Sequence, residues 1–187
     1  MTKLKYKIEE IKDFFQYDLI NFFRNVWFFR KSLVRHRWYD WGGSVSFLSE
    51  SIQDIKSGIE KRGNEEIVSR TKKVQKMERL ILLLDNLQND SYIKIAEERL
   101  GKKVISNYSF DEIKEEGELN GFYEMVNNVD EETEKVNTEI FNLAREIEIS
   151  EWSEIWDILK GQDYSKFDPK KDFDEQRDGS GLNTWWN

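Results

Sequence analysis

The chain has 187 residues, of which 38% are hydrophobic and 35% are charged, and its formal net charge at pH 7 is −8. This length suits one ordinary domain, and the large charged fraction predicts elongated elements with wide solvated faces. The acidic balance argues against binding to duplex nucleic acid, and the absence of cysteine excludes disulfides, thiolate metal sites and a cysteine nucleophile.

Charge is distributed unevenly along the chain. Residues 1–107 carry a net charge of +6, whereas residues 108–163 carry −13. Such asymmetry is typical of intramolecular docking, of head-to-tail self-association, or of a basic site beside an acidic region. The longest apolar run, 80–84, is too short to cross a membrane, and the amino terminus lacks the apolar core of a secretion signal. We therefore expect a cytoplasmic protein without a membrane segment.

The first predicted helix begins near Asp18, a suitable N-cap residue. Its apolar positions follow helical spacing and are Phe22, Val26, Phe29 and Leu33. Further aromatic residues make this helix apolar on a second side as well. We therefore expect it to be largely buried.

Two more helices are predicted between residues 40 and 87. Asp40 is the expected cap of the first, which has an apolar stripe over 45–59 and ends at Gly63. Asn64 is the expected cap of the second, whose apolar positions run over 67–87. Their stripes predict that both helices contribute to the core.

The pattern weakens after residue 88. A short helix is expected to end at Gly101, and we interpret 102–121 as an irregular connector because its signals are mixed. Asn128, with an acid three residues later, predicts the start of a long helix that reaches residue 159. Ser150 is a position at which that helix would kink or break.

These elements predict an all-α fold, an antiparallel bundle of about four principal helices with short extra helices. The helical domain spans 1–163, and 164–187 is expected to be an extended tail. The tail ends in Trp185 and Trp186, which are costly to expose to water, so we expect them to dock on this chain, on a second copy or on a partner.

The most distinctive segment is 22–41, which combines aromatic residues with cations and contains no acid before Asp40. Guanidinium groups beside aromatic rings suit either a structural cation–π cluster or a site for a flat, phosphorylated ligand. The candidate ligand-binding residues are Arg24, Arg30, Arg35, His36, Arg37, Trp38, Trp41, Gly42 and Gly43. The two glycines follow the Asp40 cap, where free backbone amides would let an anion approach closely. The alternative is that the cations pair with acidic helices and the aromatics are core.

Candidate catalytic groups are few. His36 is the only histidine, so sites with two histidines are excluded, and neither a phosphate-binding loop nor a nucleophile elbow is present. Glu154 and Asp157 resemble half of the acidic motif of all-α, magnesium-dependent nucleotide pyrophosphohydrolases, but no second motif accompanies them. In so acidic a chain a solvated helix face explains this spacing. We expect no resident cofactor or metal, and an enzyme is not favoured.

Two short motifs carry a resemblance. One runs through Trp27, Arg30, Leu33 and 37–40 to Leu48, and the other is the carboxyl end at 179–187. Together they resemble small uncharacterised proteins of tailed bacteriophages, which often pair an Arg-x-Trp-Asp-like helix junction with a Trp-Trp carboxyl end. In this chain Tyr39 interrupts the junction, and the last residue is Asn. The resemblance implies a phage origin and an accessory role in the infected bacterium.

Three functional hypotheses follow. The first is a non-enzymatic phage accessory protein that binds or sequesters a nucleotide-like ligand bearing phosphates, in a counter-defence role, with an oligomer completing the pocket. The second is a structural or protein-interaction module that assembles with itself or with a host or phage protein. Under this hypothesis, deletion of 179–187 would abolish association and leave the fold intact. The third is a helical, magnesium-dependent nucleotide hydrolase that uses Glu154.

Overall fold

A computed structural model of the protein describes residues 2–37, 40–62, 66–112 and 122–185. In chain order its elements are α1 (Thr2–Asp13), the π-helical segment η1 (Phe14–Asp18), α2 (Leu19–Arg35), α3 (Trp41–Arg62), α4 (Ile67–Gln88), α5 (Tyr92–Leu100), β1 (Tyr108–Glu112), β2 (Tyr123–Asn127), α6 (Glu131–Lys160), η2 (Tyr164–Lys166), α7 (Phe173–Gln176) and η3 (Leu182–Thr184). Helix dominates, so the predicted all-α class is confirmed in its main feature. A two-stranded sheet is the departure from it.

The first helix is much longer than predicted. α1, η1 and α2 form one continuous helix over residues 2–35, which we call the aromatic helix. Asp18 lies inside it with helical angles (φ −69°, ψ −44°) and its side chain makes no capping bond, so its prediction as an N-cap is wrong. No proline or glycine occurs between residues 2 and 35, and nothing in the backbone therefore forces a break.

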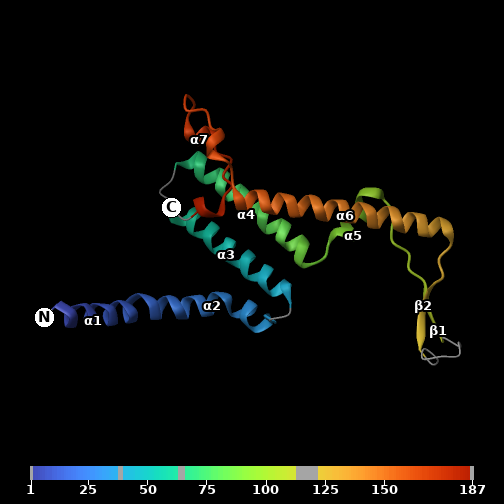
Figure 1. The fold of residues 1–187 in the computed structure, drawn as a ribbon, viewed down its shortest axis with the longest axis horizontal. Helices are drawn as coiled ribbons and strands as arrows, with labels where there is room; N and C mark the ends of the chain where they lie inside the picture. The colour runs from blue at the N-terminus through green and yellow to red at the C-terminus, as the bar shows by residue number, and fades with distance from the viewer. Residues whose placement is uncertain (1, 38–39, 63–65, 113–121, 186–187) are drawn as a thin grey trace.

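The aromatic helix projects from the rest of the molecule (Figure 1). Among the residues described, its contact with the body is at the carboxyl-terminal part, where Phe29 packs on Phe47 of α3 with ring centroids 5.7 Å apart. Phe22 is 58% exposed, Trp27 70% and Val34 75%. The prediction that this helix is buried is therefore wrong for the single chain, because too little of the body lies beside it to cover its apolar surface.

α3 and α4 form an antiparallel pair (Figure 1), and both contribute to the core, as their apolar stripes predicted. Ile52 and Ile59 of α3 share a core with Met77, Leu80 and Leu84 of α4. Asp40 accepts a hydrogen bond from the Gly42 amide at 2.9 Å, so it caps α3 as predicted. Gly63 and Asn64, the predicted stop and cap, lie outside the described residues.

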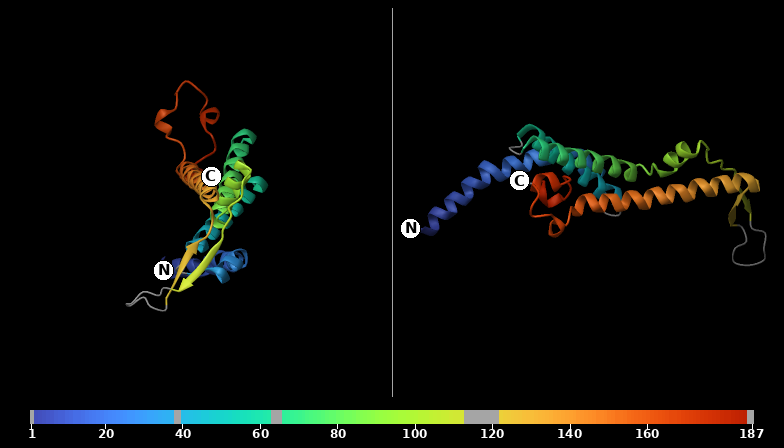
Figure 2. Two further views of the ribbon diagram at one scale, coloured as in Figure 1. Left: turned by 90° about the vertical axis from the view of Figure 1, so that its right-hand side faces the viewer. Right: turned by 90° about the horizontal axis from the view of Figure 1, so that it is seen from above.

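α6 runs unbroken for 30 residues through Ser150, so the predicted kink is absent. Its N-cap is Asp130, whose carboxylate accepts a hydrogen bond from the Thr133 amide at 2.7 Å; the predicted cap, Asn128, lies two residues earlier. The buried face of α6 carries Ile140 and Ile155 and packs on α4 and α5. Figure 2 shows α6 alongside α4 and α5 in a second view.

The predicted connector contains the first strand of a β-hairpin. β1 pairs antiparallel with β2 in a register that sets Phe110 opposite Met125. Both side chains are exposed, at 69% and 62%. The hairpin projects at the opposite end of the molecule from the amino terminus (Figure 1). The prediction of an irregular connector is therefore wrong for residues 108–112.

The tail folds back on the body instead of extending. Trp185 is 1% exposed and joins the core, and its indole Nε1 donates to the Gly179 carbonyl at 2.9 Å. The Lys72 ammonium of α4 donates to three carbonyl oxygens near α7, those of Asp174, Glu175 and Arg177, at 2.8–3.1 Å. The sequence predicted that the tryptophans dock on this chain, on a second copy or on a partner. Trp185 docks on its own chain. Trp186 lies outside the described residues.

Candidate functional site

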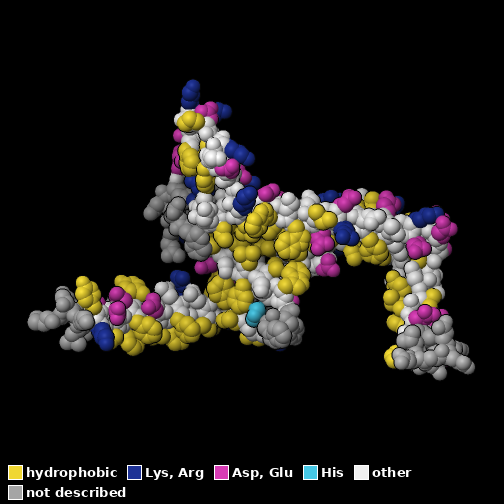
Figure 3. Space-filling model, in the orientation of Figure 1, with side chains coloured by type: hydrophobic (Ala, Val, Ile, Leu, Met, Phe, Trp, Pro, Cys, Tyr) yellow, Lys and Arg dark blue, Asp and Glu magenta, His cyan; other side chains and the backbone are white. Residues whose placement is uncertain are grey.

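The largest unexplained feature is the exposed apolar surface of the aromatic helix (Figure 3). Its side chains that are at least 50% exposed include Tyr6, Ile11, Phe14, Phe15, Tyr17, Ile20, Phe22, Phe23, Trp27, Leu33 and Val34. A helix that is apolar on more than one side is normally buried. Large contiguous apolar patches on a protein surface mark interaction sites. We therefore treat this helix as the candidate functional surface.

The π-helical segment η1 decides which apolar residues share a side. The Leu19 amide donates to the Phe14 carbonyl, an i→i+5 bond that takes up one residue more than an α-helical turn. At 3.6 residues per turn, one extra residue rotates the following helix by roughly 100°. Phe15 and Phe23 are eight residues apart, and the extra residue makes this spacing equivalent to seven, which places them on the same side.

The residues brought into line by η1 are also highly exposed. We call them the aromatic stripe: Ile11, Phe15, Ile20, Phe23, Trp27 and Val34. Their exposed fractions rise from 58% at Ile11 to 75% at Val34. Without η1 the stripe would be split between two sides of the rod. A continuous stripe at helical spacing is the form in which a helix presents itself to a groove or to another helix.

The predicted ligand-binding cations do not converge. The Arg30 guanidinium lies over the ring of Trp27, 4.2 Å from its centroid, and Arg37 Nη1 donates to the carbonyls of Val34 and His36 at 3.3 and 3.2 Å. Arg24 lies three turns before the end of α2, about 18 Å along the axis from residue 36. The side chain of Arg35, and Trp38 entirely, lie outside the described residues.

The predicted anion site at the start of α3 is filled by the protein itself. The Gly42 amide donates to Asp40 Oδ1, and the Gly43 amide donates to the Asp40 carbonyl at 3.2 Å. A Cβ atom at Gly43 would lie only 2.6 Å from Nδ1 of His36, so glycine is needed here for the imidazole to fit. His36 in turn packs edge-on against Phe47. These two glycines and His36 thus build the corner between α2 and α3. The neighbouring Trp41 is 57% exposed.

A cavity of about 240 Å³ lies beside this corner, between α2, α3 and α4. Its lining is Lys31, Ser32, Gly43, Ser46, Ser49, Glu50, Gln53, Asp85 and Gln88. Glu50 Oε2 is buried there without a hydrogen-bond partner. Two carboxylates against one lysine make this a poor place for a phosphate. Of the predicted ligand-binding residues that the structure describes, only Gly43 lines it. Glu50 was not predicted because one acid on a polar helix face carries no distinctive spacing.

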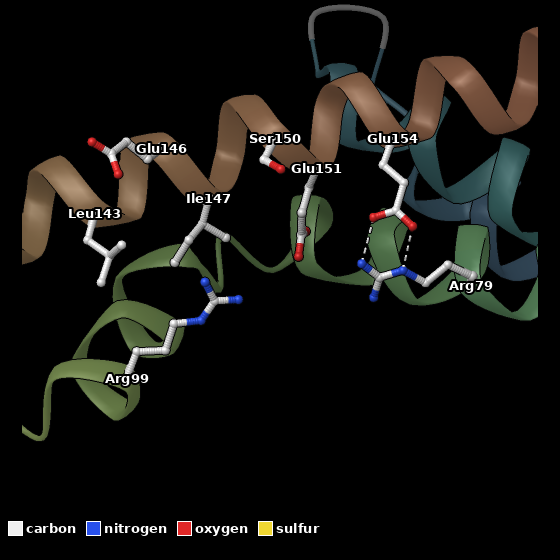
Figure 4. Close-up of a pocket in the computed structure, with 8 residues that line it drawn as sticks. All are labelled: Arg79, Arg99, Leu143, Glu146, Ile147, Ser150, Glu151 and Glu154. Atoms are coloured by element: carbon white, nitrogen blue, oxygen red, sulfur yellow. Dashed lines mark hydrogen bonds and ion pairs between the residues drawn. The ribbon is translucent and has the colours of Figure 1, made fainter.

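The pocket between α4, α5 and α6 holds the acid that the hydrolase hypothesis requires (Figure 4). Arg79 donates two parallel hydrogen bonds to Glu154, at 2.8 and 2.7 Å, and Arg99 extends from α5 toward the same face of α6. The bonds from Arg79 lower the pKa of Glu154. Among the described residues no three His, Asp or Glu side chains are grouped as metal ligands would be. Glu154 thus joins two helices as an ion pair.

α6 carries a second exposed apolar surface. Phe141, Ile149, Trp152 and Trp156 lie at helical spacings along one flank, away from the buried face, and are 45%, 61%, 46% and 64% exposed. About half or more of each tryptophan side chain is exposed in the single chain. We call these four residues the α6 flank.

Comparison with protein families, with curated proteins and with solved structures found no match. In the part of the chain that the structure describes, no helix has both the length and the apolarity needed to cross a membrane. The exposed helical surfaces are therefore the basis for a functional proposal.

Proposed function

We propose that this protein is a non-enzymatic interaction module that docks through the aromatic stripe onto a helical surface of a protein partner. The observation that carries the proposal is the continuous exposure of the stripe along a helix with only one end attached to the body. The antiparallel bundle expected from the sequence would be completed by the partner's helices. In keeping with the phage resemblance, we place this assembly in the cytoplasm of an infected bacterium.

The energetic argument is direct. Exposed apolar surface costs about 25 cal/mol per Å², and each aromatic side chain presents roughly 150–250 Å² when fully uncovered. Burial against a partner recovers this free energy, and the stripe is already presented on one continuous helix, which lowers the cost of ordering on binding. Trp27 supports the same conclusion because tryptophan and arginine are the residue types most enriched in binding hot spots, and Arg30 stacks on it.

Photo-crosslinking tests this function. A photoreactive phenylalanine analogue at Phe23 lies on the aromatic stripe, whereas the same analogue at Asn21 lies on another side of the same helix. In cells that naturally produce the protein, we expect illumination to give a discrete protein adduct from position 23 and none from position 21. Equal labelling at the two positions, or no adduct at either, would contradict the proposed docking function.

The phosphate-binding function is the second candidate, supported by the cation–π pair of Arg30 and Trp27, which is open to solvent. A stacked guanidinium beside an exposed ring is a suitable contact for a phosphorylated base. Calorimetry against mono-, di- and cyclic nucleotides at physiological salt tests it, with Arg30→Gln as the variant expected to lose binding and Arg70→Gln as the control on α4. No heat with any nucleotide would reject this candidate.

A further inference from the structure

We propose that the partner of the aromatic stripe is the α6 flank of a second copy of this chain, in a head-to-tail contact. This inference rests on the proposed docking function and names its partner. The two surfaces belong to the same molecule and are both uncovered in it: Trp27 and Val34 represent one, and Trp152 and Trp156 the other.

Charge favours this pairing over its alternatives. The aromatic helix, residues 2–35, carries eight Lys and Arg against four Asp and Glu, a net charge of +4. α6 carries three against nine, a net charge of −6. Opposite potentials across an interface favour encounter and set its register, whereas two aromatic helices facing each other would bring like charges together.

The two helices that carry the surfaces have similar lengths. The aromatic helix has 34 residues and α6 has 30, so at 1.5 Å per residue they are about 51 Å and 45 Å long. Along these helices the stripe spans about 35 Å and the flank about 23 Å, so the flank faces roughly two-thirds of the stripe. In Figure 1 the aromatic helix extends from its junction with α3 toward one end of the molecule, and α6 extends toward the other. The helix therefore points away from the α6 flank of its own chain and is placed to meet that of another.

The apolar area on the stripe reaches that of a specific interface, and the α6 flank supplies about half of it. Six residues of the stripe and four of the α6 flank are each about half exposed or more. With each large side chain presenting roughly 150–250 Å² when fully uncovered, the stripe offers on the order of 600–1,000 Å² and the flank on the order of 300–500 Å². A specific interface buries about 800 Å² per partner, so residues beside the flank supply the rest of its contact area. Because the two faces differ, the contact is heterologous, and it generates a ring, an open chain or a reciprocal dimer.

Two double variants test the pairing by sedimentation velocity at micromolar concentration. Phe23→Ala/Trp27→Ala removes the stripe, and Trp152→Ala/Trp156→Ala removes the flank; each is expected to weaken self-association at least about 30-fold. The matched controls, Asn21→Ala/Asn25→Ala and Ser150→Ala/Ser153→Ala, lie on the same helices and should associate as the unmodified protein does. Circular dichroism confirms that each variant is folded.

Mixing the two variants gives the decisive result. In a head-to-tail contact, the stripe variant keeps its α6 flank and the flank variant keeps its stripe, so an equal mixture should regain a heterodimer that neither variant forms alone. If the flank variant associates normally by itself and the mixture regains nothing, the contact is stripe to stripe and the proposal is wrong. If the unmodified protein is monomeric, the self-association proposal is wrong. If the crosslinked adduct instead has a mass different from that of a dimer, the docking function holds with another partner.

Discussion

The Nζ atom of Lys73 donates a hydrogen bond to the carbonyl oxygen of Thr184 at 2.7 Å, and both residues are buried. Lys73 belongs to α4 and Thr184 to the end of the tail, 111 residues later in the chain. The bond fastens the carboxyl terminus to the core beside Trp185. A lysine is rarely buried unless its charge is compensated, so its position marks a contact on which the local fold depends.

Replacing Lys73 by Met should destabilise the protein by about 1.5–3 kcal/mol, the range for a lost hydrogen bond from a charged donor. The Thr184 carbonyl would stay buried without this donor, which adds to the cost. Urea unfolding followed by circular dichroism measures the change. Lys94→Met, on the exposed side of α5, is the control and should leave the midpoint nearly unchanged.

Two glycine-to-alanine substitutions should have opposite signs. Gly179 has φ +86°, and a Cβ there would clash with backbone atoms of Lys72 and Lys73, so Gly179→Ala should cost more than about 1 kcal/mol. Gly58 lies inside α3 with no atom near its would-be Cβ, so Gly58→Ala should stabilise the protein by about 0.5–1 kcal/mol. Thermal unfolding of both variants decides the matter; a neutral Gly179→Ala would mean that the tail does not pack on α4 as described.

Trp185→Ala should destabilise the protein by about 3–5 kcal/mol, the usual range for removing a buried aromatic side chain. Deleting 179–187 should therefore unfold part of the body, contrary to the sequence-based expectation that this deletion leaves the fold intact. Denaturant unfolding of the point variant and limited proteolysis of the truncated chain provide the measurements. A truncated chain with unchanged stability would show that the tail docks too weakly to matter.

The ion pair of Arg79 and Glu154 predicts a pH dependence. The hydrogen bonds from Arg79 lower the pKa of Glu154 below its ordinary value of 4.5, so the folded state favours the ionised carboxylate. The resulting stabilisation is present above that value and is lost as the pH falls through the lowered pKa. Both side chains are about 40% exposed, which limits the contribution to about 1 kcal/mol or less.

Urea unfolding at several pH values, with Glu154→Gln beside the unmodified chain, measures this contribution. The stability difference should be constant near neutral pH and vanish in acid. Glu146→Gln, on the same helix and lining the same pocket, is the control for removing one negative charge from α6. A difference that grows as the pH falls would contradict the assigned pKa direction.

Local patterns were enough to predict α3, α4 and α6, because their apolar stripes are regular and a core covers them. Long-range features were not predictable in the same way. The hairpin register of Phe110 with Met125 and the return of Trp185 to α4 depend on contacts between distant segments. The cap of α6 was misplaced by two residues because Asn128 and Asp130 are both good N-cap types.

The candidate site was predicted in composition but not in geometry. The aromatic and basic segment at 22–41 contains Phe23, Trp27 and Val34 of the exposed aromatic stripe. Its burial was predicted wrongly. A helix that is apolar on all sides needs its surface buried, but the sequence does not say whether this chain or another molecule buries it. At the predicted phosphate site of Gly42 and Gly43, the Asp40 carboxylate accepts the Gly42 amide and the His36 ring packs against Gly43. These two side chains therefore already occupy the helix start that a phosphate would need.

The π turn at Phe14–Asp18 ties the length of this segment to its type of helix. Deleting one residue from it would allow a regular α-helix in which Phe15 and Phe23 are seven residues apart and still share a side, whereas a regular α-helix of the full length would turn Phe15 about a quarter-turn away from Phe23. Related chains that keep the same binding mode should therefore either keep the π turn or lack one residue here. The segment serves as a phase-setting spacer between two halves of one recognition surface.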